Sequence, residues 1–219
     1  MKNLLKNIAE TLDSCDYLRL DNKIYPPFVV LPESSSQVAD ILQAANREGF
    51  PVYVVGKGSE IRWERLTNDG ILLSTERLKK NIVVHKNDFV VEVDCGFSCE
   101  EISQKCTENA LLFPLQNLNG KISTIGGNYC SGTESIFDFY YGSFYDNVLG
   151  VEFISPEGKF VRFGGKSLKN VTGYNFQGFL YGSNGKFGVI TKLFIKLYPL
   201  KKILDYCFKI SYRYFFIHH

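Results

Sequence analysis

The sequence lacks a dominant charge, a long apolar run and an export signal. Its 219 residues carry 25 basic and 23 acidic side chains, a net charge of +2 without long blocks of either sign, so we expect no nucleic-acid partner. The longest apolar runs, such as residues 28–31, fall far short of the ~20 residues that span a bilayer, which predicts no transmembrane segment. The first dozen residues have apolar side chains at helical spacing up to Leu12 and no small-residue cleavage site. They predict a surface helix of a cytoplasmic protein.

Histidine and closely spaced cysteine pairs are also scarce. The three histidines are His85 and the two terminal residues, so no credible general base can be named and the catalytic residues stay unknown. The six cysteines lack the close pairs that zinc and iron–sulfur sites use, and a chain of this length needs no disulfides to fold. We therefore expect reduced, mostly buried thiols and no metal.

What is present is an ordinary globular composition. Hydrophobic residues make up 45% of the chain and charged residues 22%, which excludes disorder, a coiled coil and collagen. The length suits one large domain or two small ones folded together.

The pattern after residue 26 predicts a βαβ unit. A strand over residues 28–31 precedes a helix that Ser34 and Gln37 open as a capping box and that Gly49 ends, and a second strand covers residues 52–55. The usual right-handed crossover makes the two strands parallel.

The rest of the chain predicts mainly hairpins. Ser98 and Glu101 cap one further helix, and the stretch from Leu115 to Gly132 is predicted to be a long, shaped loop. The predicted strands are residues 71–74, a hairpin of 82–85 with 89–93, a hairpin of 148–154 with 159–163, and a closing strand at 189–197.

Three glycine clusters, at residues 56–58, 126–132 and 182–188, each border a predicted strand. Glycine lets a ligand approach the main chain, whose N–H groups can cradle phosphate oxygens, so the clusters favour a nucleotide site. Turns are the alternative, because 19 glycines is only slightly above average. The spacing matches neither a Rossmann fingerprint nor a P-loop.

Four stretches carry a family resemblance: VVGKGSEIRW (54–63), STIGGN (123–128), DNVLGVEFISPEGKFVRFGGKSLKNVTGYN (146–175) and GSNGKFGVIT (182–191). They resemble the PCMH-type FAD-binding domain of the vanillyl-alcohol-oxidase flavoenzymes, most closely the FAD-binding subunits of bacterial glycolate oxidases. The resemblance implies an α+β fold in which a small βαβ-containing subdomain packs on a larger antiparallel sheet with helices. It places this domain at residues 26–200, after an N-terminal helix and lead-in (1–25) and before a short C-terminal stub (201–219).

The resemblance also implies a set of FAD-binding residues. The first loop would receive the pyrophosphate, a second loop would lie along it, and the main chain of Val189 and Ile190 would meet the polar edge of the flavin. Lys57 stands where the family usually has glycine, which would cost ~1–2 kcal/mol if its φ had to be positive. The implied residues are Gly56, Lys57, Gly58, Ser59, Pro114, Leu115, Ile125, Gly126, Gly127, Gly185, Gly188, Val189 and Ile190.

The resemblance implies redox chemistry on a small 2-hydroxy acid such as glycolate or D-lactate. No His or Cys lies between Gly56 and Trp63, where covalent attachment is typical, so we expect noncovalent FAD. Only twenty residues follow Pro199, so we expect the C-terminal substrate domain to be absent. The implied partners are a larger flavoprotein subunit and an iron–sulfur subunit, which could hold the chain at the inner membrane. A non-catalytic FAD-binding relic and a truncated oxidase of another alcohol or sugar lactone are the alternatives.

Overall fold

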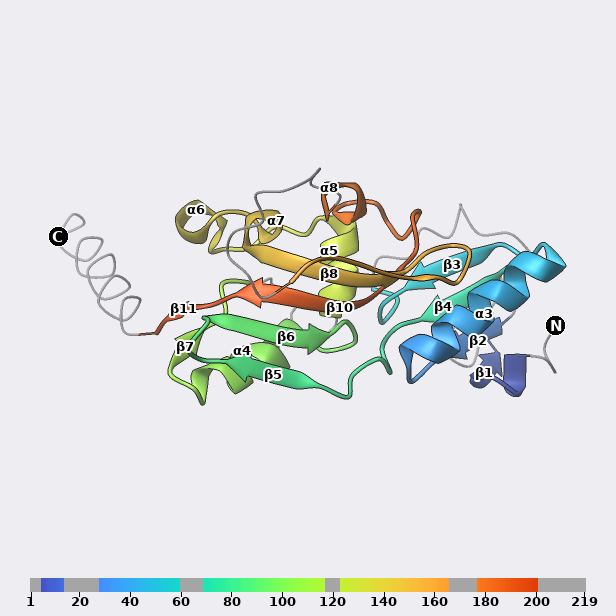
Figure 1. The fold of residues 1–219 in the computed structure, drawn as a ribbon, viewed down its shortest axis with the longest axis horizontal. Helices are drawn as coiled ribbons and strands as arrows, with labels where there is room; N and C mark the ends of the chain where they lie inside the picture. Colours follow the sequence, from blue (N-terminus) through green and yellow to red (C-terminus); the bar gives the residue numbers. More distant parts are fainter. Residues whose placement is uncertain (1–4, 14–27, 60–68, 117–122, 166–176, 201–219) are drawn as a thin grey trace, which may run out of the picture.

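The computed structural model describes residues 5–13, 28–59, 69–116, 123–165 and 177–200. Within them the chain forms two sheets that lie end to end along the long axis, a small one near the N-terminus and a larger one built mostly from later residues (Figure 1). Helices accompany both sheets, which confirms the α+β class. Several predicted parts lie outside the described residues. They are the lead-in from residue 14 to 25, the motif segments 60–63 and 166–175, and the C-terminal stub at 201–219.

The small sheet has the strand order β1-β2-β4-β3. β2 and β3 both run parallel to β4, so the predicted βαβ unit is confirmed, with β4 inserted between its two strands. β1 pairs with β2 in antiparallel fashion, so the predicted N-terminal helix does not reach Leu12. The strands are β1 (Glu10–Asp13), β2 (Phe28–Leu31), β3 (Val52–Val55) and β4 (Ile71–Ser74).

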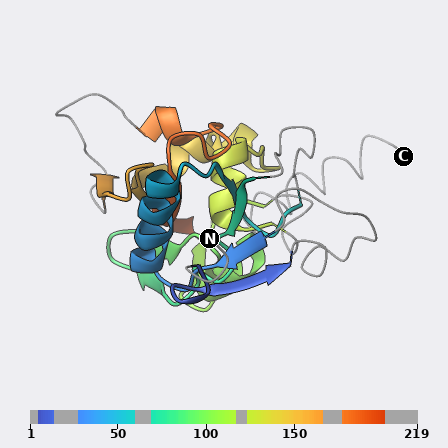
Figure 2. The same ribbon diagram turned by 90° about the vertical axis from the view of Figure 1, so that its right-hand side faces the viewer.

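Helix α3 (Ser35–Glu48) connects β2 to β3 and covers one face of the small sheet (Figures 1 and 2). The Ser34 side chain accepts a hydrogen bond from the Gln37 N–H, as predicted, while the Gln37 side chain reaches one residue further back to the Glu33 N–H. Gly49 ends the helix at φ 72°, a left-handed conformation that glycine adopts without a steric penalty.

The large sheet is antiparallel throughout and has the order β5-β6-β10-β8-β9. Both predicted hairpins are confirmed, and the closing strand β10 lies between them. A two-stranded pair, β7 (Leu111–Leu112) with β11 (Tyr198–Pro199), adjoins this sheet. The five strands are β5 (Ile82–His85), β6 (Val90–Asp94), β8 (Val148–Ile154), β9 (Phe160–Gly164) and β10 (Val189–Lys196).

Short helices pack around the large sheet. α4 (Cys99–Thr107) begins with the predicted capping box, in which Ser98 and Glu101 bond reciprocally. The loop predicted between Leu115 and Gly132 is wrong in its second half, because α5 (Ile125–Ser131) forms there. Adjacent glycines disfavour a helix intrinsically, and here the Thr124 cap and tertiary contacts outweigh that preference. The remaining helices are α6 (Asp138–Tyr141), α7 (Phe144–Asn147) and α8 (Gln177–Leu180).

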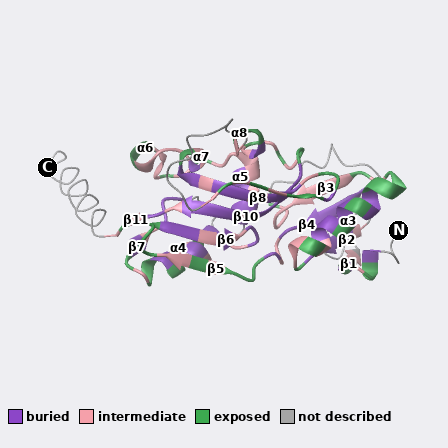
Figure 3. Ribbon diagram, viewed as in Figure 1, coloured by how far each residue is buried: buried purple, intermediate pink, exposed green. Residues whose placement is uncertain are grey.

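One continuous core extends under both sheets (Figure 3). It joins Ile41 of α3 to Ile102 of α4 and Tyr129 of α5, with apolar residues from the inner faces of both sheets between them. Because the two subdomains share this core, the boundary between them is well packed. None of the described helices is long and apolar enough to cross a membrane.

Three of the four described cysteines belong to this core, as predicted, and Cys130 is half-buried by accessible surface. Burial raises the pKa of the Cys99 thiol to about 11 and the pKa values of Cys106 and Cys130 to about 12, from an ordinary value of 9.0. The folded chain therefore keeps thiol protons that the unfolded chain releases above pH 9.

We expect the free energy of unfolding to fall as the pH rises from 9 towards 12. Each such thiol contributes full stability below pH 9 and loses about 1.4 kcal/mol per pH unit above it. Urea unfolding at a series of pH values measures the slope. In Cys106→Ala the free energy of unfolding should fall less steeply between pH 9 and 11, by about 1.4 kcal/mol per pH unit. The same pH dependence in the parent and this variant would contradict the argument.

Candidate functional site

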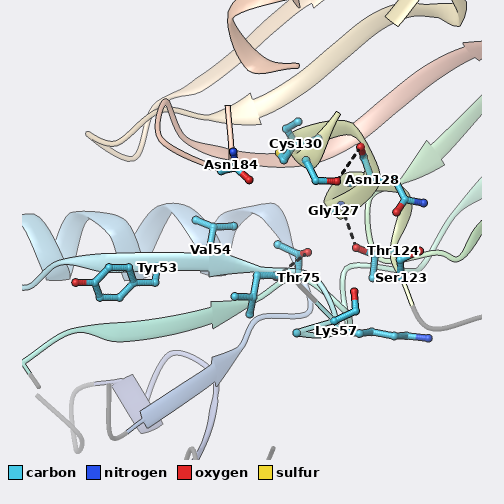
Figure 4. A pocket seen from close by; sticks show the side chains of 18 of the residues that line it. Tyr53, Val54, Lys57, Thr75, Ser123, Thr124, Gly127, Asn128, Cys130 and Asn184 are labelled. Carbon is cyan, nitrogen blue, oxygen red and sulfur yellow. Dashed lines mark hydrogen bonds between the residues drawn. The ribbon is translucent and has the colours of Figure 1, made fainter. Parts of the chain in front are cut away.

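A cavity of about 400 Å³ lies where the edge of the small sheet meets α5. Figure 4 shows β3 below the cavity, with Cys130 of α5 and Asn184 above it. Its walls come from four places: β3 and the loop that follows it, Thr75, the start of α5, and the loop before β10. The lining residues are Val52, Tyr53, Val54, Val55, Gly56, Lys57, Gly58, Ser59, Thr75, Ser123, Thr124, Gly126, Gly127, Asn128, Cys130, Ser131, Asn184, Gly185, Lys186 and Ile190.

The loop that leaves β3 is fixed at its start by side chains of the neighbouring strand. The Ser74 Oγ donates to the Gly56 carbonyl at 2.9 Å, and the Thr75 Oγ1 donates to the Val55 carbonyl at 3.2 Å. Gly58 has φ 80°, which glycine adopts without a steric penalty, whereas Lys57 is not among the residues with positive φ. The strain predicted for Lys57 therefore does not arise, because the turn places its left-handed residue one position later.

The first turn of α5 is held by three hydrogen bonds. The Ile125 N–H donates to the Phe97 carbonyl at 2.7 Å, the Gly126 N–H to the Cys95 carbonyl at 3.0 Å, and the Gly127 N–H to the Thr124 Oγ1 at 3.1 Å. These donors, which usually remain free at a helix N-terminus, are thus engaged within the protein. The start of α5 consequently presents hydroxyl groups and bare glycine Cα atoms to the cavity.

Glycine is required where α5 meets its neighbours. A Cβ on Gly126 would lie 2.7 Å from the Cys95 Cβ, and a Cβ on Gly56 would lie 2.5 Å from the Thr124 Oγ1. A Cβ on Gly127 would lie 3.9 Å from the Gly56 Cα, so the two glycine segments are in near contact. This close approach of two main chains forms the floor of the cavity.

The loop from Gly182 to Gly188 forms the opposite wall and is tied to α5. The Gly182 N–H donates to the Tyr129 carbonyl at 3.1 Å, and the Asn184 N–H donates to the Cys130 carbonyl at 2.8 Å. Asn184 has φ 53°, which is uncommon for a residue other than glycine and is tolerated best by Asn and Asp.

The structure brings most of the predicted site residues together. The loop Gly56 to Ser59, the pair Gly126 and Gly127, and Gly185 and Ile190 all line the cavity. Five others do not line it. They are Pro114, Leu115, Ile125, Gly188 and Val189.

Packing explains some of these absences from the cavity wall. Leu115, Ile125 and Val189 are buried in the core. A Cβ on Gly188 would lie 2.3 Å from the Ile154 carbonyl oxygen, so this glycine is required for packing against β8.

The sequence interpretation missed several polar wall residues, which are Thr75, Ser123, Thr124, Asn128, Ser131, Asn184 and Lys186. A signal existed for Thr124, because threonine is a favoured N-cap residue. In the structure its side chain accepts a hydrogen bond from the N–H of Gly127, three residues later. Thr75 comes from a different strand, and only the folded chain brings it to the cavity.

The charged side chains among the described lining residues of the cavity are all positive. Lys57 and Lys186 line it, and the lining residues within the described part of the chain include no Asp, Glu, His or Arg. Two cations and several hydroxyl groups suit an anionic ligand such as a pyrophosphate, and the glycines leave room for it beside the main chain. The apolar side chains of Val52, Val54 and Ile190 suit a flat heterocycle. The residues present therefore fit a dinucleotide.

Comparison with known proteins defines the class. Residues 26–164 match the model of a family described as an FAD binding domain. This match covers more than half of the chain, and the fold and glycine-lined cavity agree with it. The chain belongs to this FAD-binding family of flavoproteins, and its cofactor is FAD.

The curated relatives include D-lactate dehydrogenases, a glycolate oxidase subunit and uncharacterised FAD-linked oxidoreductases. The chain is 30% identical over 206 residues to D-lactate dehydrogenase of Archaeoglobus fulgidus, covering 89% of this chain and 46% of that protein. It is 26% identical over 175 residues to glycolate oxidase subunit GlcD of Bacillus subtilis, covering 80% of this chain and 37% of that one. The chain thus spans less than half the length of these relatives.

Solved structures show the same fold at lower identity. An alkyldihydroxyacetonephosphate synthase matches with a TM-score of 0.71 and 21% identity, over 84% of this chain and 34% of its own. A Phl p 4 variant described as a glucose oxidase matches with a TM-score of 0.75 and 15% identity, over 90% of this chain and 44% of its own. The fold implied by the sequence resemblance is therefore confirmed.

The two adjacent glycines of α5 should respond differently to alanine. Gly126→Ala should destabilise the protein by about 1–3 kcal/mol, because its Cβ meets the buried Cys95. Gly127→Ala should change stability less, because its Cβ would lie 3.1 Å from the Thr124 Oγ1 and 3.9 Å from the Gly56 Cα, but it should weaken FAD binding about tenfold or more. Urea unfolding of the apo forms and FAD titration measure both effects. Equal FAD affinity in Gly127→Ala and the parent would exclude the cofactor from this wall.

Proposed function

We propose that this chain is the FAD-binding part of an oxidoreductase that oxidises a small 2-hydroxy acid such as glycolate or D-lactate. The observation that carries the proposal is the cavity of a chain in an FAD-binding family: its described lining residues include two lysines, several hydroxyl groups and glycines, and no carboxylate. The D-lactate dehydrogenases and the glycolate oxidase subunit among its relatives support the choice of substrate class.

Each wall of the cavity has a role in holding the cofactor. The segment from Gly56 to Ser59 would face the pyrophosphate, with Lys57 and Lys186 supplying positive charge and Ser123 supplying a hydroxyl donor. Gly127 would let the ligand approach the α5 main chain. FAD, when bound, supplies the capacity to accept a hydride from the substrate.

In this proposal the groups that activate the substrate lie outside the described cavity wall. Oxidation of a hydroxy acid needs a base for the hydroxyl proton and cations for the carboxylate, and the described lining residues offer no His, Asp, Glu or Arg. These groups would come from polypeptide beyond the described residues. A larger flavoprotein subunit and an iron–sulfur subunit are the proposed partners, through which the chain could associate with the inner membrane.

The described lining residues support noncovalent attachment of FAD, because they include no His and a single cysteine. Cys130 is the cysteine among the described lining residues, and burial raises its pKa to about 12. A buried thiol of raised pKa is a weaker nucleophile than an exposed one, which agrees with noncovalent attachment.

We expect the purified protein to carry one FAD per chain. Acid precipitation should release all yellow colour into the supernatant, and high salt should weaken binding because it screens the charges of Lys57 and Lys186. Lys57→Gln should lose about tenfold in FAD affinity at low salt and less at high salt. Flavin that stays in the washed pellet would contradict noncovalent attachment.

The FAD-loaded 219-residue chain should not oxidise glycolate or D-lactate by itself. Correct positioning of the substrate can lower the reaction barrier by ~7–11 kcal/mol. A general base can raise the rate a further ~10²–10⁴-fold. Both contributions are assigned to polypeptide outside the cavity wall. Turnover with an artificial electron acceptor is measured before and after adding the candidate partners. Turnover by the chain alone would favour a complete small oxidase, and none with partners would favour the non-catalytic alternative.

A further inference from the structure

β9 forms one edge of the large sheet. In the order β5-β6-β10-β8-β9, β8 pairs with one side of β9, and within the described residues no strand pairs with the other side. An extended segment can add to such an edge through main-chain hydrogen bonds. Phe160, at the start of β9, is 66% exposed, so the beginning of this edge is open to solvent.

The hydrogen bonds to β8 show which main-chain groups point to the open side. The Gly165 N–H donates to the Leu149 carbonyl at 3.2 Å, and in an antiparallel ladder every second residue bonds to the same neighbour. Residues 161 and 163 therefore bond to β8, whereas Phe160 and Arg162 direct their N–H and C=O groups outward. Gly164 has φ 66°, which ends the extended run. β9 thus offers two donors and two acceptors to a further strand.

An apolar groove of about 300 Å³ lies beside this edge, on the core side of the sheet. Phe163 of β9 and Phe153 of β8 contact each other there, with ring centroids 5.5 Å apart, and α8 and the loop before β10 supply the remaining walls. Phe179 and Phe187 are 61% and 50% exposed, so much apolar surface in the groove meets solvent. The lining residues are Phe153, Phe163, Phe179, Leu180 and Phe187.

The two faces of the sheet set the chemistry of an added strand, because its side chains would point alternately to one face and to the other. The groove requires apolar side chains. On the opposite face Arg162 forms an ion pair with Glu152 of β8, with 3.3 Å between Nη1 and Oε1, and lies over the Phe194 ring. A segment that suits both faces therefore carries apolar side chains at every second position and mainly polar ones between them.

Residues 204–216 of this chain, LDYCFKISYRYFF, have this pattern. Every even-numbered residue is apolar or aromatic, and the odd-numbered residues from 205 to 213 are Asp, Cys, Lys, Ser and Arg. Such alternation is typical of a strand with one buried face. We propose that residues 204–216 add to the open edge of β9 as a sixth, antiparallel strand of the large sheet, with even-numbered side chains entering the groove.

The path of the chain permits this return. β9 and β10 both run antiparallel to β8, so they run parallel to each other. β11 continues from the end of β10 (Figure 1), so a chain that leaves Leu200 and turns back runs antiparallel to β9. Residues 201–219 can extend over about 60 Å, whereas pairing along β9 needs about 17 Å. The segment is therefore long enough for both the turn and the pairing.

Amide hydrogen exchange, followed by NMR on the 219-residue protein, tests the pairing residue by residue. Residues that lie opposite Phe160 and Arg162 share their face of the sheet, so odd-numbered residues of the segment donate their N–H groups to β9. Two odd-numbered amides, two positions apart, should exchange about tenfold or more slowly than the even-numbered amides beside them. Equal exchange at odd and even positions, whether fast or slow, overturns the inference.

A pair of variants at residue 162 tests the edge of β9. Arg162→Pro removes an outward N–H without breaking a ladder bond to β8, and should abolish the slow exchange of the odd-numbered amides. Arg162→Ala loses the same ion pair and ring contact but keeps the N–H, and should preserve the slow exchange. Slow exchange in Arg162→Pro as in the parent, or its loss in both variants, overturns the inference.

A second pair of variants tests the groove, and replaces the first pair if circular dichroism shows that Arg162→Pro does not fold. Phe187→Asp places a charge in the groove and should make the exchange at odd and even positions equal. Phe139→Asp changes a fully exposed phenylalanine of α6 outside the groove, and should leave the alternation intact. The same exchange pattern in these two variants overturns the inference.

Sedimentation shows which chain supplies the strand. The alternating exchange should occur in a monomer and should not change on tenfold dilution. Slow exchange that appears only in a dimer assigns the strand to another copy, and overturns pairing within one chain.

Discussion

The near contact between Gly56 and the first turn of α5 determines the shape of the cavity. A side chain on Gly56 would collide with the Thr124 hydroxyl, so the loop after β3 can approach the start of α5 this closely only because residue 56 has no Cβ. The same approach puts two bare main-chain segments and a hydroxyl group on the cavity floor. Gly126 and Gly127 both line the cavity, and a Cβ on Gly126 would in addition collide with Cys95, so packing and the cavity wall depend on the same short segment.

The main chain of Cys95 links α5 to the large sheet. Its N–H donates to the Thr191 carbonyl of β10 at 3.0 Å, while its own carbonyl accepts the Gly126 N–H of α5 at the same distance. The end of β6, the start of β10 and the first turn of α5 are thereby held in one place. Because Cys130 of α5 in turn accepts from Asn184, the two walls of the cavity are rigidly related through main-chain bonds. Such preorganisation reduces the entropy lost when a flexible dinucleotide binds.

Elements stabilised by neighbouring residues could be predicted from the sequence. The caps at Ser34 and Ser98, the left-handed end at Gly49 and both hairpins depend on contacts within a few residues, and all are present. The errors occur where distant contacts decide. Glu10–Asp13 forms a strand because β2 offers an edge to pair with, and α5 forms around two glycines because Cys95 and Phe97 accept its first N–H groups.

By itself the sequence determined the family, the cofactor class and the glycine loops, because short motifs of residues close in the chain carry those features. The tertiary structure decided which residues face the cavity. Thr75 and Lys186 reach it from other elements, whereas Val189 and Leu115 are turned into the core. Strand order joins residues far apart in the chain, and no local pattern encodes it.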